Sequence, residues 1–132
     1  MSIPIYPPSM DTDDKNQGAW LEIYADDLNS LNDAYIIDRP GRYRLIGSII
    51  NPLIDYPLFV IENVSNVRLD INNSEILISP SSRKIIPSLL ITAINCQEIV
   101  IENAILKGYQ LPMICLTNIH NSTIQNIIFS EI

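Results

Sequence analysis

The sequence is poor in the residues that mark common catalytic and metal sites. Its 132 residues include one histidine and two cysteines, and only 17% of them are charged. The lone histidine, His120, lacks the partnered serine, cysteine or acid pair that a general base needs. No CxxC pair accompanies it, so a zinc site is not supported. The sequence therefore contains no catalytic signature that stands alone, and we predict no metal ligands and no cofactor.

Long hydrophobic runs and targeting signals are also missing. No apolar run approaches the roughly 20 residues that a bilayer-spanning helix requires. The opening MSIPIYPPSMDTDD lacks the basic and apolar regions of a secretory signal. We therefore expect no membrane contact and an intracellular (cytoplasmic), virion-associated or processed protein. The hydrophobic fraction of 47% argues against disorder and suffices for one domain with its own core.

Basic residues are scarce. Eight Lys and Arg against fifteen Asp and Glu give a net charge of −7, whereas binding to a phosphate backbone demands clustered basic side chains. The composition argues against direct nucleic-acid binding, although an acidic surface that mimics nucleic acid stays open as a weaker alternative. Cys96 and Cys115 lie in apolar surroundings, which favours two buried free thiols over a disulfide.

What the sequence does contain is an internal repeat. The segments NVSNVRLD (63–70), NCQEIVIE (95–102) and NIHNSTIQ (118–125) align, each with an asparagine at its head. The spacing is 32 residues from the first to the second and 23 from the second to the third. The first interval is nine residues longer than the second, and the additional residues fall in SPSSRKIIPS (79–88). The Pro, Ser and basic residues of this segment predict an inserted surface loop.

The period and composition of this repeat favour one fold class. Short Ile-, Val- and Leu-rich strands separated by Asn and Ser, with a period in the low twenties, are typical of a solenoid. In VRLD (67–70), apolar and polar residues alternate, which predicts one apolar and one polar face. The Leu pattern does not fit leucine-rich repeats, and glycine-rich nonapeptides and hexapeptide rhythms are absent. We therefore predict an all-β chain that forms a short parallel β-helix of about four laps.

Two segments carry a resemblance to a known superfamily. RPGRYRLIGSI (39–49) resembles the PPGTYxLxGSI entry strand of right-handed β-helices in the pectate-lyase-like superfamily. FVIENVSNVRLDINNSEIL (59–77) is similar to the lap that follows this strand in the same superfamily. With the later laps, the resemblance covers residues 39–132 and implies a right-handed coil. The superfamily includes polysaccharide lyases, hydrolases, epimerases, phage tailspikes and non-catalytic members.

The segments outside the laps are predicted to differ from them. Residues 1–18, rich in Pro, Asp and Ser, are expected to be an extended or mobile arm. In residues 19–38 we expect a strand followed by a short helix within ADDLNSLNDAY (25–35), with Asp26 as a candidate N-cap. In resembling proteins such a helix covers the open end of the solenoid, so we predict a capping helix. The β-helix laps then occupy residues 39–132.

The C-terminal end of the sequence has no comparable cap. It ends at IQNIIFSEI (124–132) in the middle of a lap, without a polar or helical cap. An uncapped lap exposes apolar side chains and unpaired strand edges. We therefore expect that this end packs against another chain, or that the natural protein continues beyond it.

Polar residues that share one register are the candidate site. Asp70, Glu102 and Gln125 are expected to face outward on successive laps, about 4.8 Å apart. Two carboxylates at that spacing could divide acid and base roles, or bind a Ca²⁺ ion that neutralises an acidic sugar, as acidic residues on an exposed sheet do in the resembling enzymes. The plain alternative is a solvated surface on which Arg68 pairs with Asp70. Arg68 and Tyr109 complete the candidate carbohydrate- or partner-binding set.

Asparagines at the lap bends are predicted to have a structural role. Asn63, Asn95 and Asn118 should form a ladder in which stacked amides bond to one another and to the turn backbone. His120, beside the last of them, is expected to be a turn residue.

The sequence leaves three functional hypotheses. The first is a non-enzymatic structural or interaction module, viral or phage in origin, that forms a homo-oligomer through apolar β surface or its open C-terminal end. The resemblance to spikes implies a trimer, and the open end implies an end-to-end dimer. The second is the N-terminal fragment of a polysaccharide lyase, hydrolase or tailspike depolymerase, with Asp70 and Glu102 near the sugar groove. The third is the acidic mimic of nucleic acid.

Overall fold

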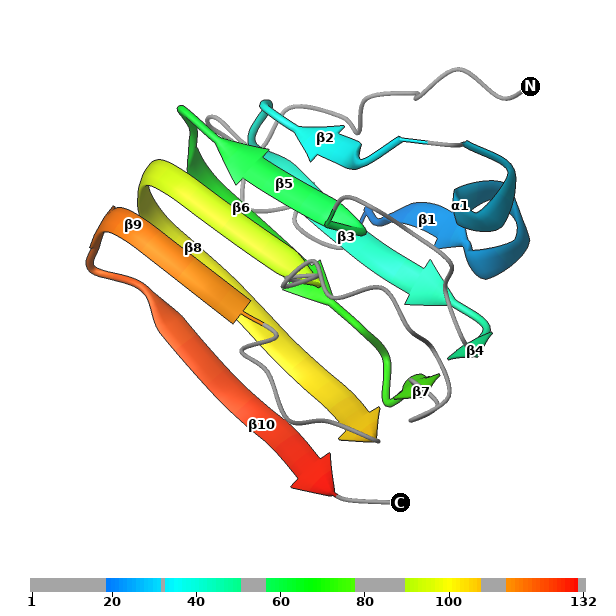
Figure 1. Ribbon diagram of the computed structural model, residues 1–132. Helices are drawn as coiled ribbons and strands as arrows, with labels where there is room; N and C mark the ends of the chain where they lie inside the picture. The colour runs from blue at the N-terminus through cyan, green and yellow to red at the C-terminus, as the bar shows by residue number, and fades with distance from the viewer. Residues whose placement is uncertain (1–18, 32, 51–56, 78–89, 108–113, 131–132) are drawn as a thin grey trace.

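Ten strands and one helix make up the described part of the chain (Figure 1). The computed structural model describes residues 19–31, 33–50, 57–77, 90–107 and 114–130. The strands are β1 (Leu21–Tyr24), β2 (Tyr35–Ile37), β3 (Gly41–Ile46), β4 (Ile49–Ile50), β5 (Phe59–Glu62), β6 (Ser65–Asp70), β7 (Glu75–Leu77), β8 (Ile91–Lys107), β9 (Ile114–His120) and β10 (Thr123–Ser130). The helix is α1 (Ala25–Leu31). The arm predicted over 1–18, the loop predicted over 79–88 and Tyr109 lie outside the described residues.

The strand pairings of the described part are parallel throughout. The main sheet order is β1-β3-β6-β8-β5-β2, and both β9 and β10 lie against β8. The first half of β8 pairs with β5 and β9, and its second half pairs with β6 and β10. Paired residues on neighbouring strands are therefore 22 to 32 residues apart in the sequence.

The register of these pairs confirms the alignment that the repeat predicts. Leu69 lies beside Ile101, and Ile101 lies beside Ile124. The column Phe59, Ile91 and Ile114 is aligned in the same way. Apolar residues thus stack on apolar residues along the sheet, and these columns are fully buried at Phe59, Leu69, Ile91 and Ile101.

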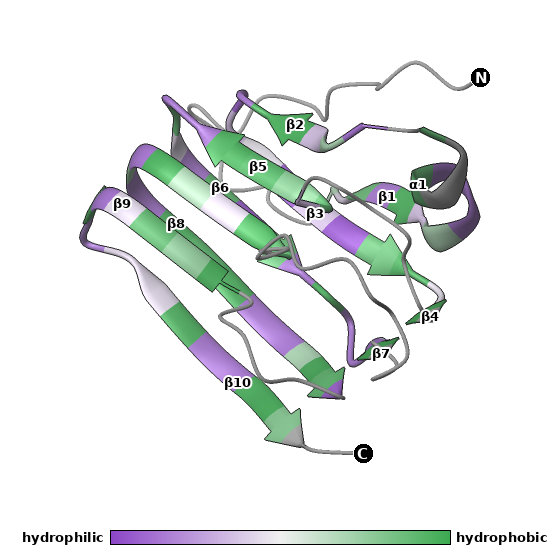
Figure 2. Cartoon of the chain, viewed as in Figure 1, coloured by the Kyte–Doolittle hydropathy of each residue, from purple (hydrophilic) through white to green (hydrophobic). Residues whose placement is uncertain are grey.

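The sheet is curled into a half-barrel that holds the apolar core (Figure 1). Hydrophobic residues recur along β5, β8 and β9 in Figure 2, and polar residues gather at the bends. The core is one cluster, and its largest fully buried members include Tyr43, Phe59, Leu69, Ile91 and Ile101. The prediction of an all-β chain with parallel strands is confirmed by this arrangement.

The predicted capping helix is not seen. The helix that is present, α1, has seven residues and contacts β1, with Ala25 and Leu28 buried in the core. It lies within residues 25–35, where a short helix is predicted, and the chain then turns at Asp33, whose Oδ1 accepts a hydrogen bond from the N–H of Ala34 at 2.7 Å. Such a side-chain bond to the local backbone competes with helix continuation. Residues 35–37 then form β2.

The bends owe their shape to asparagine. Ten described residues other than glycine have a positive φ, and nine of them are asparagines: Asn63, Asn66, Asn72, Asn73, Asn95, Asn103, Asn118, Asn121 and Asn126. The tenth is Glu98, at φ 55°. Asparagine tolerates the left-handed region better than other L-residues because its short amide bonds to the local backbone. The Asn residues that interrupt the apolar alternation therefore mark the corners of the sheet.

Candidate functional site

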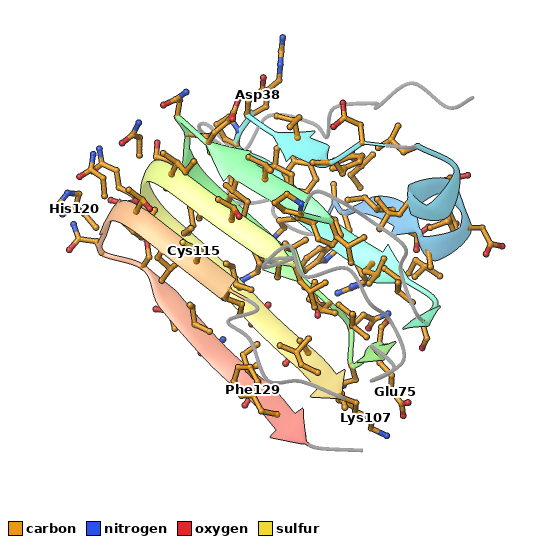
Figure 3. The ribbon with its side chains drawn as sticks, viewed as in Figure 1. Asp38, Glu75, Lys107, Cys115, His120 and Phe129 are labelled. Carbon is orange, nitrogen blue, oxygen red and sulfur yellow. The ribbon has the colours of Figure 1, made fainter. Side chains whose placement is uncertain are left out.

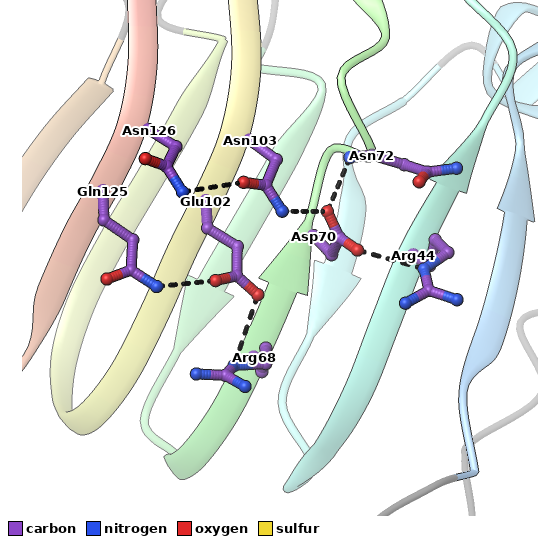
Figure 4. A network of polar contacts seen from close by, with 8 residues as sticks. All are labelled: Arg44, Arg68, Asp70, Asn72, Glu102, Asn103, Gln125 and Asn126. Carbon is purple, nitrogen blue, oxygen red and sulfur yellow. Dashed lines mark hydrogen bonds and ion pairs between the residues drawn. The ribbon is translucent and has the colours of Figure 1, made fainter.

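Asp70, Glu102 and Gln125 lie side by side on three neighbouring strands (Figure 4). Asp70 ends β6, Glu102 lies within β8 and Gln125 lies within β10. Their neighbours Leu69 and Ile101 are fully buried in the core, so the three polar side chains leave the sheet on its other face. The structure thus brings together the three residues that the repeat placed in one register.

Both carboxylate oxygens of Asp70 accept hydrogen bonds. Oδ1 accepts from the backbone N–H of Asn72 at 2.7 Å and from Nδ2 of Asn103 at 2.9 Å. Oδ2 accepts from Nε of Arg44 at 3.0 Å. These donors come from β3, from the turn after β6 and from β8, so one carboxylate links three neighbouring parts of the sheet.

Glu102 is engaged in a similar way. Its Oε1 accepts from Nε2 of Gln125 at 2.7 Å, and its Oε2 lies 3.3 Å from Nε of Arg68. Arg68 therefore pairs with Glu102, and the predicted pair of Arg68 with Asp70 is wrong. Each arginine pairs with a carboxylate on the next strand of the sheet, Arg44 of β3 with Asp70 of β6 and Arg68 of β6 with Glu102 of β8. Opposite charges on the same face of neighbouring strands attract each other in this way.

The two carboxylates are also less exposed than the sequence predicted. The side chain of Asp70 is 7% exposed and that of Glu102 is 11% exposed. The two carboxylates thus lie on the face opposite the core, as expected, but the expectation that this face leaves them solvated is wrong. Arg44 and Arg68 lie against these carboxylates, and Arg44 in turn lies against Trp20. The Cζ atoms of Arg44 and Arg42 lie 4.0 Å and 4.9 Å from the centroid of the Trp20 ring, within the range of cation–π attraction.

This arrangement limits what the carboxylates can do chemically. A general base or nucleophile needs an oxygen within reach of a substrate, whereas each oxygen of Asp70 and Glu102 is held by a donor of the protein. Buried and paired charges of this kind are costly to break, because the loss of one partner leaves the other unpaired. The geometry favours a role in fixing strand register over a role in catalysis.

Two ladders of amide side chains cross the bends. In the first, Nδ2 of Asn95 donates to Oδ1 of Asn63 at 3.2 Å, and Nδ2 of Asn118 donates to Oδ1 of Asn95 at 2.8 Å. In the second, Nδ2 of Asn126 donates to Oδ1 of Asn103 at 3.2 Å. Two of these pairs, Asn95–Asn118 and Asn103–Asn126, are 23 residues apart, and Asn63 and Asn95 are 32 apart; these are the spacings of the repeat.

His120 lies at the bend between β9 and β10 (Figure 3). Its Nε2 is 3.1 Å from Oδ1 of Asn118, and its backbone carbonyl accepts a hydrogen bond from Oγ of Ser122 at 2.9 Å. Both contacts are made within the bend itself, as expected for a turn residue.

Strands β9 and β10 form an edge of the sheet in the part of the chain that the structure describes. Side chains here that would be core residues on an inner strand are exposed: Leu116 by 44%, Ile124 by 40% and Phe129 by 63%. A pocket of about 490 Å³ opens between the two strands. Its lining includes apolar Leu116, Ile119 and Ile124 and polar groups of the bend, among them Asn118 and His120. No signal in the sequence pointed to this pocket.

Other kinds of site find little support in the described residues. No group of three His, Cys, Asp or Glu among them is placed to hold a metal ion. Cys96 is buried and Cys115 half-buried, and both are free thiols. None of the described helices combines the length and the apolar character that a membrane crossing demands.

The fold and the site define an all-β chain with a curled parallel sheet, paired buried carboxylates and amide ladders. The chain matches no protein-family model, no curated protein and no solved structure. Function therefore has to be inferred from the chain's own geometry.

Proposed function

We propose that this chain is a non-enzymatic structural module that assembles with copies of itself through the edge formed by β9 and β10. The proposed fold is a short right-handed parallel β-helix of the pectate-lyase-like type. Three observations support it: parallel pairing at separations of 22 to 32 residues, stacked like residues, and left-handed asparagines at the bends. The handedness and the superfamily rest on the sequence resemblance.

One comparison within the sheet carries the proposal of assembly. Ile101 and Ile124 are the same residue type in adjacent positions of one column, yet Ile101 is fully buried and Ile124 is 40% exposed. The difference arises because β8 has a strand on each side, whereas β10 pairs only with β8 among the described strands. Exposed apolar side chains along an open strand edge are typical of surfaces that pair with another chain.

The site geometry makes the enzyme alternative less attractive. A polysaccharide lyase or hydrolase would need oxygens of Asp70 and Glu102 free to act on a sugar or to bind Ca²⁺. Those oxygens accept hydrogen bonds from protein donors, and both side chains are buried. We therefore assign Asp70, Glu102, Arg68 and Gln125 to the stability of the sheet. An edge-to-edge contact joins two copies, so the oligomer that we propose is an end-to-end dimer rather than a trimer.

Solution mass over a dilution series tests the assembly. Light scattering after gel filtration should give a mass near twice the 14.9 kDa of one chain, falling toward one chain on dilution. A mass of one chain at every concentration would contradict the proposal.

The enzyme alternative has a separate test. We expect acidic polysaccharides incubated with the protein, with and without Ca²⁺, to keep their chain length. Shortening of the polysaccharide that is abolished by Asp70→Asn would favour the enzyme instead.

A further inference from the structure

The β9–β10 edge carries no charge. Residues 114–130 contain no Asp, Glu, Lys or Arg, in a chain whose net charge is −7. Exposed edge strands are usually protected by charged residues or proline, and this edge has neither. Two acidic copies repel each other least where both are neutral. The edge is therefore the part of the described surface best suited to contact a second copy.

The two ends of β10 show the same order of inward and outward side chains when they are followed in opposite directions. Ile124 lies over Ile101 and Phe129 lies over Leu106, both of them fully buried, so Ile124 and Phe129 face inward. Gln125 follows Ile124 in the strand and therefore faces outward.

The bend at Asn126, with φ 56°, interrupts the alternation between these two positions. After it, Ile127 packs against the core and Ile128 is 57% exposed, so Ile128 faces outward like Gln125. From Ile124 to Phe129 the order is therefore inward, outward, bend, inward, outward, inward, and the two end positions match in reverse order: Ile124 with Phe129, and Gln125 with Ile128.

In an antiparallel pair, directly opposite residues lie on the same face. A second β10 that runs antiparallel, centred between Asn126 and Ile127, places Ile124 opposite Phe129 and Gln125 opposite Ile128. At these two pairs an inward residue meets an inward residue and an outward residue meets an outward one, while the bend residue Asn126 lies opposite Ile127 at the centre. A shift by one residue would break the match at both pairs.

The pocket beside β10 completes the argument. Ile124 lines the pocket of about 490 Å³, together with Leu116 and Ile119. Phe129 of a second copy, opposite Ile124, would lie at the mouth of this pocket, which has room for a phenyl ring. Phe129 is also the most exposed large apolar side chain of the described residues, at 63%.

We propose that β10 pairs antiparallel with β10 of a second copy about a two-fold axis, and that each Phe129 enters the pocket of the other copy. This inference rests on the proposed self-assembly and adds the interface, its register and its anchor residue. The contact is isologous, with the same surface contributed by both copies, so it closes at two chains. An aromatic side chain in a central pocket is the usual energetic centre of such an interface.

The first test removes the anchor. Phe129→Ala should raise the dissociation constant of the dimer at least about 30-fold. Tyr24→Ala is the matched control, because Tyr24 is an aromatic side chain, 48% exposed, on β1 at the other end of the sheet. It should leave the dissociation constant unchanged. Circular dichroism of both variants checks that they fold.

The second test reads the register by disulfide formation. When Gln125→Cys chains are mixed with Ile128→Cys chains and oxidised, mixed dimers linked between these positions should form, because opposite Cα atoms lie within disulfide range. Gln125→Cys alone should form few dimers, since its copies lie about three residues apart along the strand. Wild-type protein, with Cys96 and Cys115, is the background control.

The outcomes separate the two proposals. A wild-type chain that is monomeric overturns both the self-assembly and the interface. A wild-type dimer that Phe129→Ala leaves intact, or one whose disulfides form at other pairs, overturns the β10 interface while the self-assembly stands.

Discussion

At the scale of the residue, Asp70 accepts hydrogen bonds from the nearby backbone of Asn72 and from two side chains that are far away in sequence. Arg44 lies 26 residues before it and Asn103 lies 33 residues after it. Both come to Asp70 because their strands pair with β6 in register. A single buried carboxylate thus ties three neighbouring strands together, and its removal would leave donors on each of them unpaired.

Replacement of Asp70 should therefore be costly. We expect Asp70→Ala to lower the free energy of unfolding by about 2–4 kcal/mol, because it breaks a buried ion pair and leaves Arg44 without its partner. Glu75→Ala is the control, since it removes an ion pair with Lys107 in which Glu75 is 48% exposed; it should cost less than about 1 kcal/mol. Urea denaturation measures both, and equal losses would contradict the structural role of Asp70.

Glu98 is the exception among the left-handed corner residues. It adopts φ 55° where the equivalent corners use asparagine. Asparagine is less strained in this region, so Glu98→Asn should stabilise the protein by roughly 0.5–1 kcal/mol. Gln97→Asn, at an adjacent position outside the positive-φ set, should give no gain. A higher denaturation midpoint for the first variant alone is the expected result; a loss of stability in Glu98→Asn would show that the corner is not limited by backbone strain.

At the scale of the element, β8 and β10 differ in what covers them. Ile101→Ala on β8 should cost about 2–5 kcal/mol because it opens a cavity in the core. Ile124→Ala on β10 changes the same residue type one strand further along, at 40% exposure, and should cost less than half as much. Urea unfolding at protein concentrations low enough to keep the chain monomeric gives the comparison. Similar costs would mean that the edge of β10 is covered within one chain.

The elements also show what the sequence could predict. The column of Asn63, Asn95 and Asn118 could be predicted, because asparagine recurs at the corners and each repeat shows this pattern within its own sequence. The burial of Asp70 could not be predicted, because its ion-pair partner Arg44 lies before the repeat begins. A short helix within residues 25–35 could be predicted from the apolar spacing, whereas its end depends on the local turn at Asp33.

At the scale of the whole molecule, the chain combines a net negative charge with one neutral edge. The fifteen acidic residues of each copy favour electrostatic repulsion between two copies. The β9–β10 edge of the described residues is uncharged, so two copies can make contact there without this repulsion. This distribution favours limited assembly, because an isologous contact uses the edge of both partners.

All of these inferences depend on parallel strands stacked in register, and nuclear magnetic resonance can test that directly. Nuclear Overhauser cross-peaks between backbone protons should join Ile91 to Ile114 and Gln97 to His120, the pairs that the parallel register brings together. An antiparallel arrangement of the same strands would instead bring Ile91 close to His120. Cross-peaks of the first kind are the predicted result, and cross-peaks of the second kind would contradict the fold and the interface built on it.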